Sequence, residues 1–302
     1  MLLLNIFANN LLPILLLSGA GFILGKTLKI DSRPLGRVIF YILSPVLVFD
    51  LLTSNELPIN RIAIMMGFTV AGTLTLAGLA FLIGKILRLE RGPLTIVVLT
   101  SMCVNAGNFG LPLVSFAFGQ SALTYASIYF VTSSLILNTL GVLVASLGHM
   151  DLKQALRGLF KIPAIYAILL AILFIQTGWI LPEPISRTLS LAAGGAIPGM
   201  LILLGLELTR FEWSRDLRTL SIPVFVRLIL GPIIGLGMAA LFGLQNPARQ
   251  AGITEMSGPT GVLTAVLATE FELDSRLVTA IVFTSTILSP LSLTLVLYFL
   301  GR

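Results

Sequence analysis

Hydrophobic residues in this chain run in long blocks that are separated by short polar stretches. The blocks hold roughly 18–26 residues each. An α-helix needs about 20 apolar residues to cross a bilayer, whereas a strand of a membrane barrel needs only about 9–11. The pattern therefore predicts an all-α polytopic membrane protein with ten transmembrane helices. The predicted spans are approximately residues 7–25, 37–54, 62–86, 93–118, 122–147, 161–180, 185–208, 219–242, 248–270 and 277–299.

The composition agrees with this pattern. Of 302 residues, 56% are hydrophobic and 11% are charged, and the mean hydropathy is +1.02. A soluble domain carries about 25% charged residues, so this chain cannot cover a water-facing surface. In lipid every backbone polar group needs a partner inside the protein. All predicted loops are short, which leaves one membrane domain in contact with membrane lipid.

The positions of the cations predict the orientation. Positive residues prefer the cytoplasmic loops, and 14 of the 19 Lys and Arg residues follow the odd-numbered predicted spans. Four cations fall on the other side. We therefore expect a multi-pass protein of the cell inner (plasma) membrane with both termini outside. The net charge of +6 then reflects topology, and no nucleic-acid partner is expected. The fourteen are Lys26, Lys29, Arg33, Arg37, Lys85, Arg88, Arg91, Lys153, Arg157, Lys161, Arg210, Arg215, Arg218 and Arg276.

Few residues are suited to catalysis or to holding a cofactor. Cys103 and His149 are the only cysteine and the only histidine, so an internal disulfide is impossible and a usual His/Cys metal site is not expected. The chain has no HExxH, GxGD or Gly-x-Ser-x-Gly motif. It also lacks the phosphate-binding loop of ATP-driven pumps. We expect neither an enzyme nor a bound cofactor.

The two halves of the chain resemble each other. Pro13 and Pro163, Pro45 and Pro198, and the pairs Gly107-Asn108 and Gly258-Pro259 are offset by 150, 153 and 151 residues. These matches predict a first five-helix repeat at 1–150 and a second at 151–302. Five spans are an odd number, so the second repeat is inverted in the membrane. Inverted repeats with paired broken helices are typical of secondary transporters.

Two of the predicted spans contain residues that interrupt a helix. The stretch CVNAGNFGLP, residues 103–112, combines two asparagines, two glycines and a proline, all unfavourable in a helix interior. The second stretch, at 257–260, reads SGPT. Each break would start a new half-helix whose positive end faces a cavity and favours an anion. Tolerated kinks are the alternative. The residues assigned to substrate binding here are Asn105, Gly107, Asn108, Gly110, Pro112, Gly258, Pro259 and Thr260.

Glu255 and Arg227 lie well inside predicted spans, where a charge is costly and commonly functional. Glu255 is expected to carry the coupling ion, with a water-exposed vestibule position as the alternative. Na⁺ favours oxygen donors, but proton transfer by the same carboxylate is equally possible chemistry. Arg227 is a further substrate-binding candidate; it can instead pair with Glu207 or extend to the cytoplasmic face. The sodium ligands proposed are Glu255, Asn105, Thr132, Ser133 and Thr254.

Several motifs, in order along nearly the whole chain, resemble the auxin efflux carrier family. They are FYILSPVLVFDLL (40–52), NAGNFGLPL (105–113), AIPGMLILLGLEL (196–208), VRLILGPIIG (226–235), SGPTGVLTAVLA (257–268) and STILSPLSL (285–293). The resemblance implies ten helices in two inverted repeats, with helices four and nine crossing near the substrate. It also implies a panel made of helices one, two, six and seven, and a possible homodimer.

The same fold is similar to that of bile acid:sodium symporters. In those proteins a glutamate just before the ninth-helix break helps to bind sodium, and Glu255 stands three residues before Gly258. We therefore expect a secondary active transporter of a small organic anion, a carboxylate, with elevator-type alternating access and sodium coupling. A proton-coupled or uncoupled auxin-carrier-like efflux uniporter is the alternative, and an ion channel is less favoured because no filter motif is visible.

Overall fold

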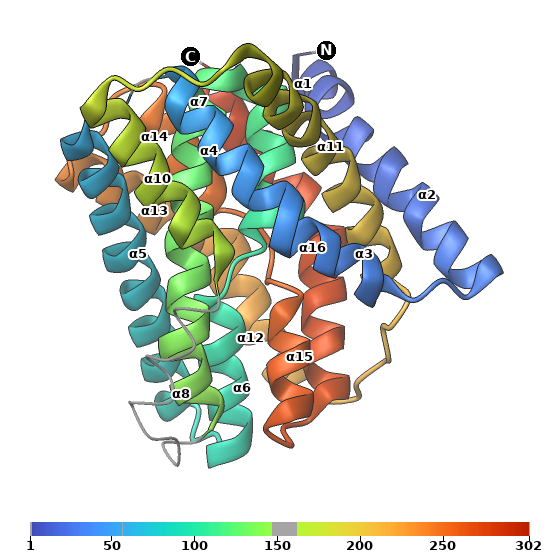
Figure 1. Ribbon diagram of the computed structural model, residues 1–302. Helices are drawn as coiled ribbons and strands as arrows, with labels where there is room; N and C mark the ends of the chain where they lie inside the picture. The colour runs from blue at the N-terminus through green and yellow to red at the C-terminus, as the bar shows by residue number, and fades with distance from the viewer. Residues whose placement is uncertain (1, 56, 147–161, 302) are drawn as a thin grey trace.

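The computed structural model describes residues 2–55, 57–146 and 162–301, and these fold almost entirely into helices (Figure 1). Several helices continue one another through a single π-helical turn, labelled η. In chain order the elements are α1 (Leu2–Ile6), η1 (Phe7–Leu11), α2 (Leu12–Leu28), α3 (Ser32–Val38), η2 (Ile39–Leu43), α4 (Ser44–Asn55), α5 (Ile59–Ile86), α6 (Arg91–Met102), η3 (Ala106–Gly110), α7 (Leu111–Ile136), η4 (Leu137–Gly141), α8 (Val142–Ala145), α10 (Pro163–Thr177), α11 (Glu183–Leu208), α12 (Leu217–Phe225), η5 (Val226–Leu230), α13 (Gly231–Leu241), α14 (Ala248–Met256), α15 (Leu263–Glu270) and α16 (Ser275–Leu300).

Seven helices of the described residues are long and apolar enough to cross a membrane. One of them, Ala106–Ala145, is 40 residues long and changes direction at Gly119, where φ is +75°. The predicted spans at 93–118 and 248–270 fall on segments broken near their middles, and the span at 161–180 falls on the shorter α10. The all-α membrane class is therefore confirmed, while the count of ten spans stays a prediction.

The helices pack in two groups. One contains α2, α4, α10 and α11, with α11 packed along α2 and α10 along α4; the other contains α5, α6, α7, α13 and α14. Gly21 on α2 and Gly205 on α11 let these two helices approach closely, because a methyl group at either position would overlap backbone atoms of the other helix. Small residues serve this purpose where helices meet in lipid.

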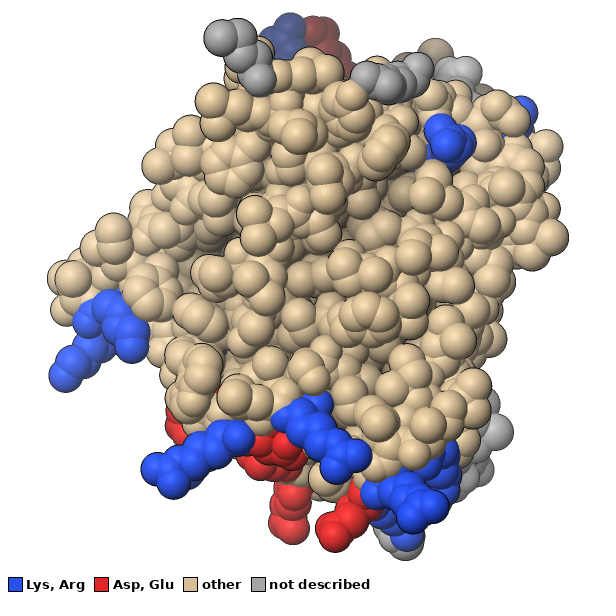
Figure 2. All heavy atoms as spheres, turned by 180° about the vertical axis from the view of Figure 1, so that it is seen from behind, with Lys and Arg blue, Asp and Glu red and all other residues tan. Residues whose placement is uncertain are grey.

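Both termini lie at one end of the molecule (Figure 1). Lys and Arg gather at the opposite end, together with several acidic residues, and the surface between is nearly free of charge (Figure 2). This distribution matches the asymmetry expected from the loops. The boundary between the predicted halves lies outside the described residues. So do five residues of the sequence analysis and the C-terminus: His149, Lys153, Arg157, Lys161 and Arg302.

Candidate functional site

Two broken segments cross near the centre of the molecule. Helix α6 rises from the end rich in cations and α14 descends from the end that holds the termini (Figure 1). Between α6 and η3, and between α14 and α15, the chain is extended. Asn105 N donates to Pro259 O at 2.9 Å and Gly261 N donates to Cys103 O at 2.8 Å, an antiparallel pairing centred on Val104 and Thr260. Each break thus satisfies backbone groups of the other.

Local sequence explains the first break. Asn105 ends the extended stretch, and its Oδ1 accepts a hydrogen bond from Asn108 N at 3.2 Å, while its backbone O accepts from Gly110 N at 3.0 Å. An asparagine is among the best residues for starting a helix in this way. Pro112 then lies in the first turn of α7, where its missing N–H is not needed.

The second break is fixed mainly by hydrogen bonds to its backbone. Thr260 Oγ1 donates to Thr100 O at 3.1 Å, and Thr260 N donates to Ser285 Oγ at 3.1 Å. Thr264 Oγ1 donates to Gly261 O at 2.7 Å at the start of α15. Thr260 and Ser285 are both fully buried. The second break is therefore tied to α6 and α16 at the crossing.

Arg227 on η5 is fully buried beneath the crossing. Its Nε and Nη2 donate to Gly258 O at 3.1 and 2.8 Å, Nη2 also to Met256 O at 3.0 Å, and Nη1 to Ser101 O at 3.4 Å. Ser101 lies in the last turn of α6 and Met256 ends α14. The last carbonyls of a helix lack helical partners, and a cation is favourable there. Arg227 therefore stabilises the ends of both half-helices.

Glu255 lies in the last turn of α14 and is also fully buried. Neither carboxylate oxygen has a hydrogen-bond partner. A methyl group added at Gly110 would overlap this carboxylate, so the glycine leaves the space that Glu255 fills. Arg227 attracts it electrostatically across the crossing. A buried carboxylate without hydrogen bonds is costly, so this position suits a bound cation or a proton.

Several buried hydroxyl oxygens of α6, α7 and α14 are of the kind that binds a hard cation. Thr254 Oγ1, Ser101 Oγ and Ser133 Oγ are buried and have no hydrogen-bond partner, and oxygen atoms are the ligands that such cations prefer. Thr132 is different, because its Oγ1 already donates to Ile128 O at 2.8 Å. Of the predicted sodium ligands, Glu255 and Thr254 thus offer unpartnered oxygens on α14, and Ser133 offers one on α7.

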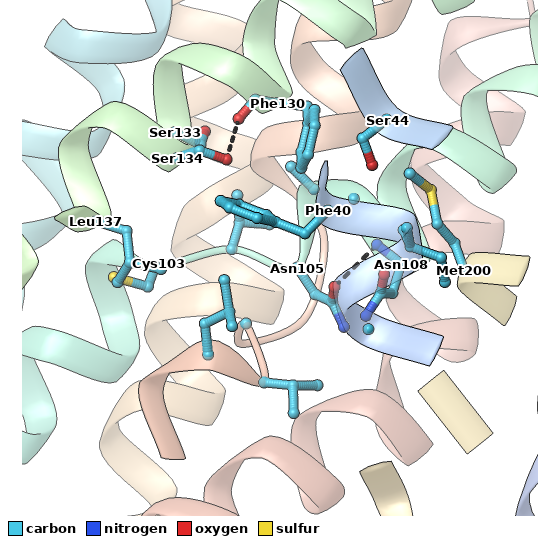
Figure 3. A pocket seen from close by; sticks show the side chains of 18 of the residues that line it. Phe40, Ser44, Cys103, Asn105, Asn108, Phe130, Ser133, Ser134, Leu137 and Met200 are labelled. Atoms are coloured by element: carbon cyan, nitrogen blue, oxygen red, sulfur yellow. Dashed lines mark hydrogen bonds between the residues drawn. The ribbon is translucent and has the colours of Figure 1, made fainter. Parts of the chain in front are cut away.

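A cavity of about 490 Å³ lies beside the crossing. Asn105 and Asn108 enter it from the first break, with Phe40 and Phe130 over them (Figure 3). Asn105 is buried and its Nδ2 has no hydrogen-bond partner. The first residues of η3 and of α15 also line the cavity. The cavity therefore combines one free amide donor and two helix N-terminal ends with a largely apolar wall.

The cavity continues toward the end of the molecule that is rich in cations. Arg33 and Arg37 of α3 belong to its lining. A second cavity, of about 620 Å³, shares Arg33 and Glu207 with the first and adds Arg210 and Glu212. Asn108 Nδ2 donates to Glu207 Oε2 at 3.3 Å. A solute entering from this end would pass basic side chains before it reached the asparagines.

The predicted substrate residues separate into two sets. Asn105, Gly107 and Asn108 line the first cavity. The others are buried in the crossing and do not line either of these two cavities: Gly110, Pro112, Gly258, Pro259, Thr260 and Arg227. Arg227 neither pairs with Glu207 nor extends to the surface, because its donors are all directed to backbone carbonyls.

The sequence alone did not identify the walls of the cavity. Phe40, Phe130 and Met200 come from three different segments, η2, α7 and α11, and contribute apolar side chains. Apolar residues are so common in this chain that no pattern distinguishes these three. The contact between Glu207 and Asn108 joins positions 99 residues apart, so the sequence does not show it. Its isolated charge near the end of an apolar block was the available signal.

An all-helical membrane protein with two broken segments crossing beside a cavity is typical of secondary transporters. Comparison with known proteins agrees with this class. Residues 6–297 match the family described as membrane transport protein. The chain belongs to this family, the auxin efflux carrier family, whose members are transporters and not enzymes.

Individual relatives are also transporters by name. An uncharacterized transporter of Methanothermobacter thermautotrophicus is 28% identical over 298 residues, covering 95% of this chain and 96% of that protein. An uncharacterized transporter of Methanocaldococcus jannaschii is 26% identical and covers 87% of this chain and 88% of its own length. Auxin efflux carrier component 8 of Arabidopsis thaliana is 28% identical over 163 residues, 51% of this chain and 44% of that protein.

Proposed function

We propose that this protein is a secondary active transporter of a small organic anion that carries a carboxylate. The observation that supports this most strongly is the free Asn105 amide, buried in a cavity at the crossing. Asn108 and the first residues of η3 and α15 lie around the same cavity. Half-helix ends carry partial positive charge, so together these groups favour a negative headgroup.

The remaining wall of the cavity suggests an apolar body for this anion. Phe40, Phe130 and Met200 form much of the lining near Asn105. Cavities of about 300–1,000 Å³ are usual for small-molecule ligands, and about 490 Å³ falls in this range. The name of the Arabidopsis relative points in the same direction, because auxin is a small acid. We therefore expect an aromatic or branched monocarboxylate.

Alternating access would require one helix group to move relative to the other. In the elevator version, α2, α4, α10 and α11 form the fixed panel, and the crossing moves with α5, α6, α7, α13 and α14. The cavity reaches Arg33 and Arg37, which we place on the cytoplasmic side with both termini outside. The described state is then open to the cytoplasm. The inverted repeats 1–150 and 151–302 are supported by the way the two breaks pair.

Coupling to a cation is proposed at Glu255. Its unpartnered carboxylate oxygens and Thr254 Oγ1 are suited to Na⁺, and Asn105 and Ser133 belong to the same proposed set. Arg227 already supplies a positive charge that acts electrostatically on Glu255, and this charge favours the second version, in which Glu255 binds no metal ion. Transport would then be proton-coupled or uncoupled.

Uptake into proteoliposomes tests the transport function. We expect saturable uptake of benzoate, phenylacetate or indole-3-acetate by the wild type, at rates well below those of a channel. Asn105→Ala should reduce uptake at least about tenfold, equivalent to about 1.4 kcal/mol. Asn55→Ala is the matched control, because Asn55 Nδ2 donates to Leu51 O within its own helix and Asn55 is not among the described residues that line the cavity. Equal uptake by wild type and empty liposomes for every acid would contradict the proposal.

Thermal stability of the detergent-purified protein tests the coupling ion. A ligand that binds only the folded state stabilises it by about 2.7 kcal/mol at a hundredfold excess over Kd. Sodium coupling predicts a rise in Tm with Na⁺ that K⁺ and choline do not produce, and that Glu255→Gln abolishes. If Na⁺ does not specifically raise the Tm of the wild type, sodium coupling is contradicted and the proton-coupled or uncoupled version remains.

A further inference from the structure

Glu207 places a negative charge at the cavity that is proposed to bind an anion, where it would repel the substrate. It lies near the end of α11 and lines both cavities. Among the described residues that line the first cavity it is the one carboxylate, and its Oε2 accepts a hydrogen bond from Asn108 Nδ2 at 3.3 Å. The panel helix thus presents a carboxylate to the amide beside the proposed substrate site.

A bound substrate carboxylate would meet Glu207 in two ways. It would compete for the Asn108 amide, which has only two N–H donors. It would also place a second negative charge in the same cavity, and two carboxylates that share a site do not both stay ionised. The favourable outcome is that one of them takes up a proton.

Asn108 Nδ2 is the one hydrogen-bond donor that the described residues offer to the Glu207 carboxylate, so a substrate that takes this donor leaves Glu207 as the carboxylate without a partner. Elements η3 and α7, which face Glu207 across the cavity, contain no charged residue. Arg210 acts on Glu207 electrostatically, but it also donates to Asp31 Oδ1 at 2.8 Å. Glu212 likewise pairs with Arg276 at 3.0 Å. The other charged groups on elements packed around this end of α11 are Lys26 and Lys29 beside α2, Arg33 and Arg37 on α3, and Glu270 on α15.

We propose that Glu207 is the proton acceptor of this transporter: as the substrate carboxylate displaces the Glu207 carboxylate from the Asn108 amide, a Glu207 oxygen takes up one proton from the buffered solution. The protonated acid then offers an O–H donor to the anion instead of a repelling charge. This inference rests on the proposed transport of organic anions, and it is independent of the ion at Glu255. One anion and one proton would bind together.

The geometry gives this proton a route. Glu207 lines the second cavity as well as the first, and the second cavity opens among Arg33, Arg210 and Glu212 at the end of the molecule rich in cations. Glu207 is therefore reached from the proposed cytoplasmic side, and Glu255 is buried without lining either of these cavities. The two carboxylates are placed for separate roles.

Titration calorimetry of benzoate binding tests the proposal on the purified full-length chain. Two buffers of equal pH and different ionisation enthalpy report the number of protons taken up per benzoate. For the wild type we expect an uptake approaching one, and an affinity that rises by up to tenfold for each unit of falling pH. Glu207→Gln should bind benzoate with no proton uptake and no dependence on pH.

Glu212→Gln is the matched control, because Glu212 lines the second cavity but has no hydrogen bond to Asn108. It should keep the proton uptake of the wild type. Wild-type binding without proton uptake would overturn the role of Glu207 whether or not the variant folds, and so would uptake that persists in Glu207→Gln. If benzoate, phenylacetate and indole-3-acetate all fail to bind the wild type, the transport proposal itself is overturned.

Discussion

The two broken segments pair with each other through their backbones and differ in side-chain chemistry. The first, at Cys103–Gly110, brings Asn105 and Asn108 into the cavity. The second, at Ser257–Gly261, brings only Gly261 to the cavity and is held by Arg227, Ser285 and Thr100. Under the proposed function, the first break recognises the ligand, and the second keeps the crossing in place.

Substitution of Arg227 should have the largest effect on stability. Arg227→Met leaves three backbone carbonyls without their donor and leaves Glu255 buried without a nearby positive charge. Each buried acceptor left without its donor costs about 1–3 kcal/mol, so we expect a strongly lowered Tm in detergent. Adding Glu255→Gln should recover part of this loss. A wild-type Tm in Arg227→Met would show that the second break does not depend on the arginine.

Gly110 tests how closely the two breaks fit together. Gly110→Ala places a methyl group against the buried Glu255 carboxylate, and overpacking of this kind costs about 1–3 kcal/mol. Gly194→Ala on α11 is the matched control, since no atom lies within 4 Å of its added methyl group; there we expect no loss or a gain of about 0.5–1 kcal/mol. Equal Tm changes in the two variants would mean that Glu255 can move away freely.

A pair of variants separates recognition from support. Ser285→Ala removes the acceptor of Thr260 N in the second break, which should cost about 1–3 kcal/mol of stability and leave the benzoate Kd of the folded protein unchanged. Asn105→Ala should weaken the benzoate Kd, and the loss of its cap on Asn108 N should cost about 0.5–2 kcal/mol of stability. Parallel Tm and binding measurements check both. If each variant changes both quantities equally, the two breaks are not specialised.

Asp31, at the surface, should show the smallest effect. The hydrogen bond from Arg33 N lowers the pKa of Asp31 below its ordinary value, and the Arg210 charge acts in the same direction. A carboxyl group with a lowered pKa contributes stability above its unfolded value, and this contribution disappears as pH falls through the folded value. The Tm difference between wild type and Asp31→Asn should therefore shrink below about pH 4. A difference that is constant with pH would contradict the ionic contribution.

The fold class and the positions of both breaks could be predicted from the sequence because they depend on local chemistry. Long apolar blocks specify membrane helices. Single prolines are tolerated inside helices, as Pro198 and Pro290 are, so the clusters at 105–112 and 257–260 are what mark the breaks. The comparisons also confirm the family that the motifs indicated. The count of ten spans and the sodium ligands remain predictions.

The role of Arg227 could not be predicted in the same way. A single arginine in an apolar block indicates an unusual environment but does not say which groups surround it. Its acceptors belong to residues 29, 31 and 126 positions away, and only the packed structure brings them together. The Asn108–Glu207 contact and the aromatic wall of the cavity likewise depend on tertiary packing.

The pairing of Val104 with Thr260 also has a consequence for how the protein is made. These residues are 156 positions apart, and a chain grows from its N-terminus. The opened backbone at Cys103–Asn105 is therefore synthesised long before Pro259 and Gly261 exist to pair with it. In a bilayer such groups need a partner. During biogenesis water, the insertion machinery or another segment must therefore satisfy these groups, and a ribosome stalled before residue 260 would leave them without their final partners.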